Sequence, residues 1–113
     1  MDRDTALLFT RQGLGDGPAD LQMKLAGRFL SLLLDAGTLP GCILCYTDGV
    51  RLACAGSPVL DQLHALEGRG VEIILCQTCL DTFGLTDQVA VGIVGGMPDI
   101  ITALQRAAKV ISL

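Results

Sequence analysis

The sequence predicts an α/β fold, a three-layer sandwich in which helices cover a mostly parallel five-stranded sheet. Five short apolar runs alternate with segments of helical periodicity along the 113 residues. The apolar runs are continuous rather than alternating, which is typical of parallel strands covered on both faces. Strand and helix follow one another throughout, as in an open sheet built from right-handed crossovers.

The first half of the chain supplies two strands and one long helix. Apolar residues 5–10 form the first strand, and the glycine-rich turn after it ends at Pro18, which suits the first position of a helix. From there to about Asp35, apolar residues recur at helical spacing, and Gly37 ends the helix. Apolar residues 41–46 form the second strand.

The second half begins with a turn at residues 47–50 and a short extended piece at residues 51–54. Ser57 then caps a second helix, which ends at the glycines from Gly68 to Gly70. The remaining elements follow from the same alternation of patterns. They are the strand 71–76, the short helix 78–84, the strand 88–94, the helix that opens at Pro98 and the strand 109–113.

Composition excludes several classes of protein. Net charge is -4 and aromatic residues make up only 4% of the chain, so neither a basic stripe nor a stacking platform for nucleic acid is present. The first ten residues do not read as a signal peptide, and no apolar run is long enough to span a bilayer. We therefore expect a cytoplasmic protein that binds neither nucleic acid nor membrane.

The apolar content favours self-association. Half of the residues are apolar, and the mean hydropathy of +0.54 is high for so small a domain. The predicted first helix carries leucines beyond one face, at Leu30 and Leu34 as well as Leu25 and Phe29. One side of such a helix meets the sheet and the other needs a partner, so we expect a homo-oligomer, most simply a dimer or trimer.

Two cysteines, Cys76 and Cys79, mark the end of the third strand and the start of the helix after it. A helix N-terminus carries partial positive charge and unpaired N–H groups, which stabilise the thiolate, the reactive form of cysteine. Cys76 is therefore expected to be the most reactive thiol. Two other interpretations stay open. The C-x-x-C motif also fits a redox pair, and Cys76 could simply be a small, buried hydrophobic residue.

A four-cysteine zinc site is a further interpretation, because Cys42 and Cys45 repeat the spacing of Cys76 and Cys79. Residues three apart in a strand point to opposite faces, so Cys42 and Cys45 cannot converge on one ion. We expect both to belong to the core and predict no metal site and no cofactor.

Several residues after the strands are candidate anion- or substrate-binding groups. Ligands of open α/β sheets bind beyond the carboxyl ends of the strands, where the connecting loops share one edge. His64, the only histidine, lies in a predicted helix and is expected at its surface, while Arg51 is a possible source of positive charge. The candidate binding residues are Gly13, Gly15, Gly49, Gln77, Thr78, Gly96 and Met97.

The longest stretch that resembles a known family is YTDGVRLACAGSPVLDQLHALEGRGVEIILCQTCLDTFGL, residues 46–85. It resembles the C-terminal domain of YedF-type proteins, sulfurtransferase-like proteins linked to selenium metabolism, within the DsrE/DsrF-like sulfur-relay superfamily. Residues 13–37 and 89–113 are also similar, so the resemblance covers nearly the whole chain. It implies a compact sandwich of the flavodoxin or Rossmann kind that forms dimers, trimers or hexamers.

The resemblance also implies a site. In the sulfur-relay members a cysteine after a central strand accepts and passes on a persulfide, and by position this cysteine is Cys76, with Cys79 beside it. Two positions depart from the YedF-like pattern: Gln77 stands where a glycine is usual, and Gly96 where an asparagine is usual. The N-terminal TusA-like domain of YedF proteins has no counterpart in residues 1–113, so we expect a single stand-alone DsrE-like domain.

Together these observations predict a small carrier of sulfur or selenium. Cys76 would hold a persulfide or selenylsulfide, Cys79 would assist or resolve it, and donor and acceptor would be other proteins, such as a TusA-like protein or a cysteine desulfurase. Two alternatives stay open. The chain could be a non-catalytic scaffold subunit of a sulfur-relay complex, or a C-x-x-C thiol redox protein.

Overall fold

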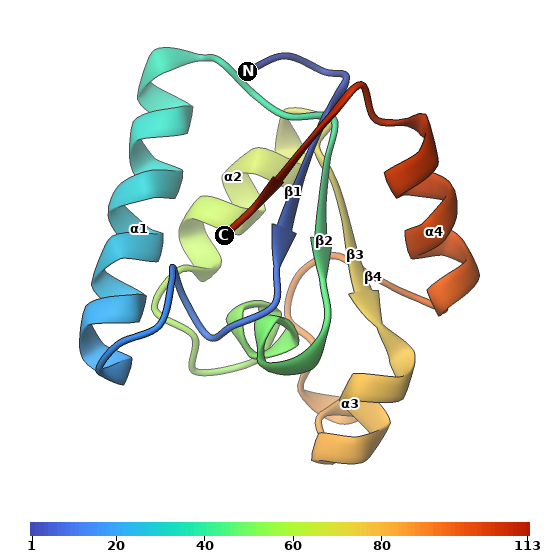
Figure 1. Ribbon diagram of the computed structural model, residues 1–113. Helices are drawn as coiled ribbons and strands as arrows, with labels where there is room; N and C mark the ends of the chain where they lie inside the picture. Colours follow the sequence, from blue (N-terminus) through green and yellow to red (C-terminus); the bar gives the residue numbers. More distant parts are fainter.

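A five-stranded sheet forms the centre of the computed structural model, which describes residues 1–113 (Figure 1). Every neighbouring pair of strands runs parallel, and the strand order is β4-β3-β2-β1-β5. The α/β fold predicted from the sequence is confirmed. The strands are Thr5–Phe9 (β1), Cys42–Cys45 (β2), Glu72–Cys76 (β3), Ile93–Gly95 (β4) and Lys109–Ser112 (β5).

Helices cover both faces of the sheet and one of its ends. Figure 1 shows α1 and α2 on one face, α4 on the other, and α3 beyond the carboxyl ends of the strands. Two 3₁₀ helices, η1 and η2, complete the fold. The helices are Ala19–Ala36 (α1), Leu60–Gly68 (α2), Gln77–Phe83 (α3) and Met97–Arg106 (α4), and the 3₁₀ helices are Thr47–Ala53 (η1) and Thr86–Gln88 (η2).

The strand order explains which helix covers which face. From β1 to β3 each strand is added on the same side of the last one, so right-handed crossovers place α1 and α2 on one face. The chain then returns from β4 at one edge of the sheet to β5 at the other. A right-handed connection in this reverse direction places α4 on the opposite face.

Alternation along β3 divides its side chains between the two layers. Ile74 borders a cavity beside α4, so Cys76, two residues further on, points to this face of the sheet. Ile73 and Leu75 point to the face covered by α1 and α2, and both are buried. Both faces of β3 are thus apolar, as its continuous run of apolar residues predicts.

The structure corrects three element boundaries. Residues 47–53 form the 3₁₀ helix η1 instead of a turn followed by an extended piece. Strand β4 has only three residues. The first part of the predicted strand holds the last residue of η2, Gln88, and an isolated antiparallel bridge between Val89 and Cys54. Helix α2 begins at Leu60 rather than next to Ser57, whose Oγ accepts a hydrogen bond from Val59 N in the turn before the helix.

The core is aliphatic, as the low aromatic content predicts, with Phe9 as its only buried aromatic side chain. Leu30 of α1 is fully buried, so it belongs to the core and not to a second apolar face of the helix. His64 is exposed on α2, as expected. No helix is both long and apolar enough to cross a membrane.

Candidate functional site

The two cysteines of the C-x-x-C motif differ in exposure. Cys76 is the last residue of β3 and the residue that precedes α3, and only 2% of its surface is exposed. Cys79 lies in the first turn of α3 and is half-buried. That Cys76 is the most reactive thiol stays a prediction. Cys79 is the more accessible member of the pair, because Cys76 is buried.

The backbone of Thr47 contacts Cys79 directly. Thr47 is the first residue of η1, at the carboxyl end of β2, and its N–H donates a hydrogen bond to Cys79 Sγ at 3.0 Å. Its φ of 49° lies in the left-handed region, which a β-branched residue adopts only under strain. Strained backbone of this kind is concentrated at functional sites. In this protein the left-handed conformation of Thr47 directs its N–H toward Cys79 Sγ.

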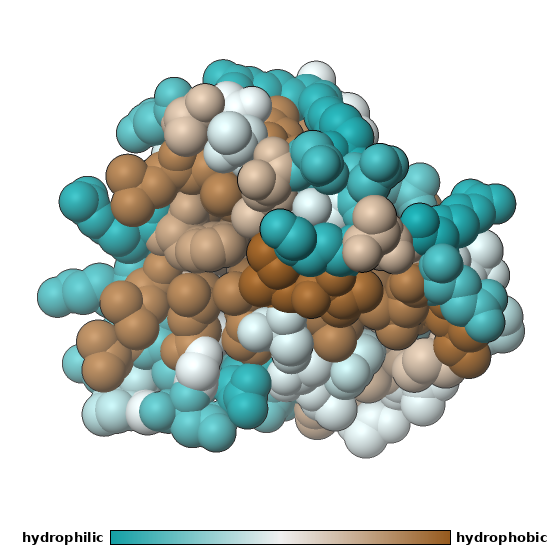
Figure 2. Space-filling model, turned by 45° about the horizontal axis from the view of Figure 1, so that its top comes forward, coloured by the Kyte–Doolittle hydropathy of each residue, from teal (hydrophilic) through white to brown (hydrophobic).

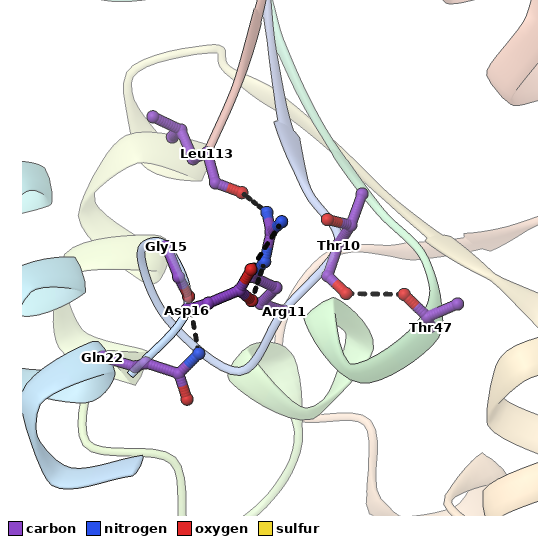
Figure 3. A network of polar contacts seen from close by, with 7 residues as sticks. All are labelled: Thr10, Arg11, Gly15, Asp16, Gln22, Thr47 and Leu113. Carbon is purple, nitrogen blue, oxygen red and sulfur yellow. Dashed lines mark hydrogen bonds and ion pairs between the residues drawn. The ribbon is translucent and has the colours of Figure 1, made fainter. Parts of the chain in front are cut away.

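The hydroxyl group of Thr47 holds this conformation in place. Its Oγ1 lies 2.6 Å from the carbonyl oxygen of Thr10 and 2.7 Å from that of Tyr46, so its single proton is shared between two acceptors. Figure 3 shows the bond that joins Thr47 to Thr10, the residue after β1. The carboxyl ends of β1 and β2 and the first turn of α3 are thereby linked around Cys79.

Burial raises the pKa of the Cys79 thiol above its ordinary value. The hydrogen bond from the Thr47 N–H acts in the opposite direction, because it stabilises the thiolate. A hydrogen bond with the Cys76 thiol and the charge of that group raise the pKa of Cys79 again. Because the pKa of Cys79 lies above its ordinary value, Cys79 is mostly a thiol at neutral pH.

Arg51 brings positive charge to the same end of the sheet. Its guanidinium group lies over the ring of Phe83, 4.2 Å from the centroid, and its Nε contacts Asp48 Oδ1 at 2.9 Å. Phe83 follows Cys79 by four residues, so the two side chains share one face of α3. Arg51, a possible source of positive charge near the site, therefore lies against α3.

Two of the glycines predicted to bind an anion have packing roles. A side chain on Gly49 would collide with the carbonyl oxygen of Phe9, and one on Gly13 would collide with the backbone of Gln22. Both glycines are buried and let chain segments approach closely. Gly15 is exposed, and its carbonyl oxygen accepts a hydrogen bond from Gln22 Nε2 at 2.6 Å (Figure 3).

The remaining binding candidates lie near the cysteine pair. Gln77 and Thr78 are exposed between the two cysteines. Gly95 of β4 is in register with Cys76, so Gly96 and Met97 continue the chain beside it. Met97 is 44% exposed.

The N–H of Gly96 is not free to bind an anion. It donates to Asp99 Oδ2 at 2.9 Å, so a carboxylate of the chain itself already occupies it. Asp99, the third residue of α4, therefore caps the helix. This role of Asp99 was not expected, although a capping box places an acidic residue at this spacing.

A second set of contacts fixes the loop after β1. Arg11 Nε forms an ion pair with Asp16 Oδ1 at 2.6 Å, and Arg11 Nη1 donates to the carbonyl oxygen of Leu113 at 3.1 Å (Figure 3). The glycine-rich loop is thus tied to the end of β5. Neither this role of Arg11 nor that of Thr47 was expected, because each depends on residues distant in the sequence.

The other three cysteines lie away from solvent to different degrees. Cys45 is buried, and burial raises the pKa of its thiol to about 12. Cys54 is also buried, and its Sγ donates to the Val50 carbonyl oxygen at 3.3 Å. Cys42 is half-buried, with the carboxylate of Glu72 nearby. No three Cys, His, Asp or Glu side chains converge as metal ligands would.

Solved structures of the same fold include three proteins that match almost the whole chain. The ychN protein from E. coli has a TM-score of 0.69 and 18% identity, with 100% of both chains covered. MTH1491 from Methanobacterium thermoautotrophicum, a protein of unknown function, has a TM-score of 0.65 and 17% identity, with 96% of this chain and 97% of that chain covered. BT1422 from Bacteroides thetaiotaomicron, also of unknown function, has a TM-score of 0.69 and 16% identity, with 97% and 95% covered.

At this level of identity the similarity establishes the fold and not the activity. None of the curated proteins matches this chain. The model of the DsrE/DsrF-like family, a family associated with sulfur relay, matches residues 14–113. This range includes Cys76, Cys79 and the Thr47 turn that contacts them. The chain therefore belongs to the DsrE/DsrF-like family.

Proposed function

We propose that this protein carries sulfane sulfur as a persulfide on the Cys76 and Cys79 pair and passes it to a partner protein. The observation that supports the proposal most directly is the hydrogen bond from the Thr47 N–H to Cys79 Sγ at 3.0 Å. A fixed donor of this kind favours the anionic form of sulfur, which is the form that attacks in transfer.

Cys79 is the member of the pair that meets the donor. It is half-buried, whereas Cys76 is 2% exposed and lies behind it at the end of β3. In loading, the Cys79 thiolate attacks the outer sulfur of a donor persulfide. The bond between the donor's two sulfur atoms breaks, the donor leaves as a thiolate, and Cys79 keeps the sulfane sulfur. An acceptor thiol removes that sulfur by the same step.

The raised pKa of Cys79 adds a condition on when transfer occurs. Burial and the neighbouring Cys76 thiol keep Cys79 mostly protonated at neutral pH, so an isolated domain reacts slowly. A bound partner that brings positive charge, or that uses the guanidinium of Arg51, would raise the fraction of thiolate. The donor and acceptor classes we propose are a cysteine desulfurase and a TusA-like protein.

Selenium is the second cargo that the site could accept. Attack of the Cys79 thiolate on the selenium of a donor selenylsulfide would transfer that selenium to Cys79 and release the donor as a thiolate. The Thr47 N–H would contact Cys79 Sγ in the same way. The resemblance to YedF-type proteins is the reason to test selenium beside sulfur. Gln77, which replaces the usual glycine of that branch, is exposed next to the pair and would contact the bound atom first.

Self-association is also part of the proposal. Figure 2 shows a band of apolar surface across the molecule between α1 and α4. The exposed apolar side chains on these elements and on β5, which lies at the sheet edge, are Leu21, Leu25, Leu32, Met97, Ile101 and Val110. An apolar band along an unpaired edge strand favours contact with a second copy of this chain.

Sulfur loading tests the carrier function. The purified, reduced protein is incubated with a cysteine desulfurase and cysteine, and its intact mass and peptide masses are measured. We expect a gain of one sulfur atom on Cys79, abolished in Cys79→Ser and retained in Cys42→Ser, which alters a half-buried thiol at the opposite end of β2. Absence of the adduct on every cysteine would instead favour the scaffold function, in which this chain only supports an assembly.

A further inference from the structure

The pairing of Cys76 with Cys79 has a chemical consequence for the loaded protein, and it rests on the proposed carrier function. Cys76 is buried, so no partner thiol reaches it. It immediately precedes α3, and Cys79 is the third residue of that helix, so the two side chains lie next to each other at the helix N-terminus. Its environment therefore leaves one sulfur within reach. That sulfur is Sγ of Cys79, the inner atom of the proposed persulfide.

We propose that Cys76 discharges an uncollected persulfide by attacking Sγ of Cys79, which releases hydrogen sulfide and leaves a Cys76–Cys79 disulfide. The Cys76 thiol gives up its proton, and its sulfur forms a bond with Cys79 Sγ. The bond between Cys79 Sγ and the sulfane sulfur breaks, and the outer sulfur leaves with the bonding electron pair and is protonated. One persulfide and one thiol become one disulfide and one hydrogen sulfide.

The electrons balance within the protein. The sulfane sulfur gains two electrons and becomes sulfide, and the two cysteine sulfur atoms lose them as they join. No external oxidant takes part. A dithiol reductant then opens the disulfide and returns both thiols, after which the protein can be loaded again.

Position decides which sulfur Cys76 attacks. The outer sulfur of a persulfide on Cys79 extends away from Sγ toward the partner, because transfer requires it to be accessible. Cys76, in contrast, is buried at the end of β3. Thr47 holds Sγ in place through its N–H, so the inner sulfur stays next to Cys76 while the outer one is exposed.

Cys76 therefore limits how long the protein stays loaded. A partner that collects the sulfur quickly receives it by transfer. Without a partner the cargo is lost as sulfide, and the protein is left in an oxidised form that cannot accept more. The two outcomes compete for the same persulfide, and the partner's rate of collection decides between them.

The test follows loaded protein after the donor and all small thiols have been removed. Intact mass and released sulfide are measured over time for wild type, Cys76→Ala, Cys76→Ser and Cys42→Ser. In wild type and Cys42→Ser we expect the extra sulfur to disappear, sulfide to appear in equal amount, and the mass to fall two hydrogen atoms below the reduced protein. In the Cys76 variants the adduct should persist and no sulfide should form.

The outcomes separate the two proposals. If wild type and both Cys76 variants keep the extra sulfur equally long, the discharge step is wrong and the carrier function stands. If no form takes up sulfur, the carrier function fails and the discharge step fails with it. Two Cys76 variants are used, with thermal unfolding as a check, because a buried serine destabilises more than alanine does. A folded Cys76 variant that still releases sulfide would also overturn the inference.

Discussion

The N–H of Thr47 and the Sγ of Cys79 are joined by a hydrogen bond of 3.0 Å, which connects the end of β2 with the first turn of α3. Thr47 adopts a left-handed conformation to make it, and its hydroxyl group bonds to the Thr10 carbonyl oxygen. The more accessible thiol of the C-x-x-C pair is thus positioned by a residue 32 positions away in the sequence. Reactivity at Cys79 should depend on Thr47 as much as on α3.

Replacing Thr47 with valine should slow the reaction of Cys79. Thr47→Val keeps the branched shape but removes Oγ1, so the strained conformation loses the bonds that hold it and the N–H turns away from Sγ. Because that N–H lowers the pKa of Cys79, its loss raises the pKa and reduces the thiolate at neutral pH. The rate of iodoacetamide alkylation measured against pH checks this. Thr47→Ser keeps the hydroxyl and should behave like wild type.

The order in which cysteines react should follow exposure. We expect Cys79 to be alkylated before Cys76, Cys45 and Cys54, all of which are buried. The raised pKa of Cys79 means that its rate at neutral pH lies below that of a free thiol and increases as the pH rises. Quenched labelling followed by peptide mass mapping gives the order. Faster labelling of Cys76 would show that the end of β3 opens in solution.

Removal of Cys45 should alter stability at alkaline pH. Its pKa is raised from 9.0 to about 12, so the folded protein keeps a proton that the unfolded chain loses. The contribution of this group is therefore complete below the ordinary value and is lost as the pH rises toward the folded value, by at most about 1.4 kcal/mol per pH unit. Denaturant unfolding of wild type and Cys45→Ala across this range should show a shallower decline in the variant.

At neutral pH, Cys45→Ala should lower the free energy of unfolding by about 1 kcal/mol, as modest core truncations do. Cys42→Ala should cost less, because Cys42 is only half-buried. Neither variant should change sulfur loading. If a variant lost sulfur loading while its free energy of unfolding stayed unchanged, the replaced cysteine would belong to the functional site.

Gly49 and Gly15 provide a matched pair that separates packing from binding. A methyl group on Gly49 would collide with the Phe9 carbonyl oxygen, so Gly49→Ala should destabilise the protein by about 2 kcal/mol or more. Around Gly15 there is open space, and only its left-handed conformation penalises alanine, by about 1 kcal/mol. Chemical denaturation measures both changes. If folded Gly49→Ala failed to take up sulfur, Gly49 would belong to the binding site after all.

Charge on the apolar face of α1 should disrupt the proposed oligomer. Leu25 is 42% exposed and Leu32 is 49% exposed, so glutamate at either position is tolerated by the folded chain but not inside an apolar interface. Sedimentation equilibrium should show an oligomer for wild type and a smaller species for Leu25→Glu and Leu32→Glu. Lys24→Glu, an exposed charge change on the same helix, is the control. A wild-type mass of 11.8 kDa would exclude self-association.

The sequence by itself determined the layers of this protein. Continuous apolar runs predict parallel strands covered on both faces, and Gly37 ends the first helix as expected, with a left-handed φ of 70°. Such features depend on neighbours a few residues apart, so their physical cause is local. The position of β5 next to β1 is not decided locally. It depends on the connection through α4, which carries the chain from β4 at one edge of the sheet to β5 at the other.

For the cysteine pair, too, some features follow from the local sequence and others only from the tertiary structure. Its spacing and its place at a strand end follow from the residues alone. Which sulfur reaches solvent was decided by tertiary packing, since β4 and α4 lie beside Cys76 while Cys79 projects from the first turn of α3. The donor to Cys79 comes from Thr47, and a hydrogen bond between segments so far apart exists only once the strands have assembled into one sheet.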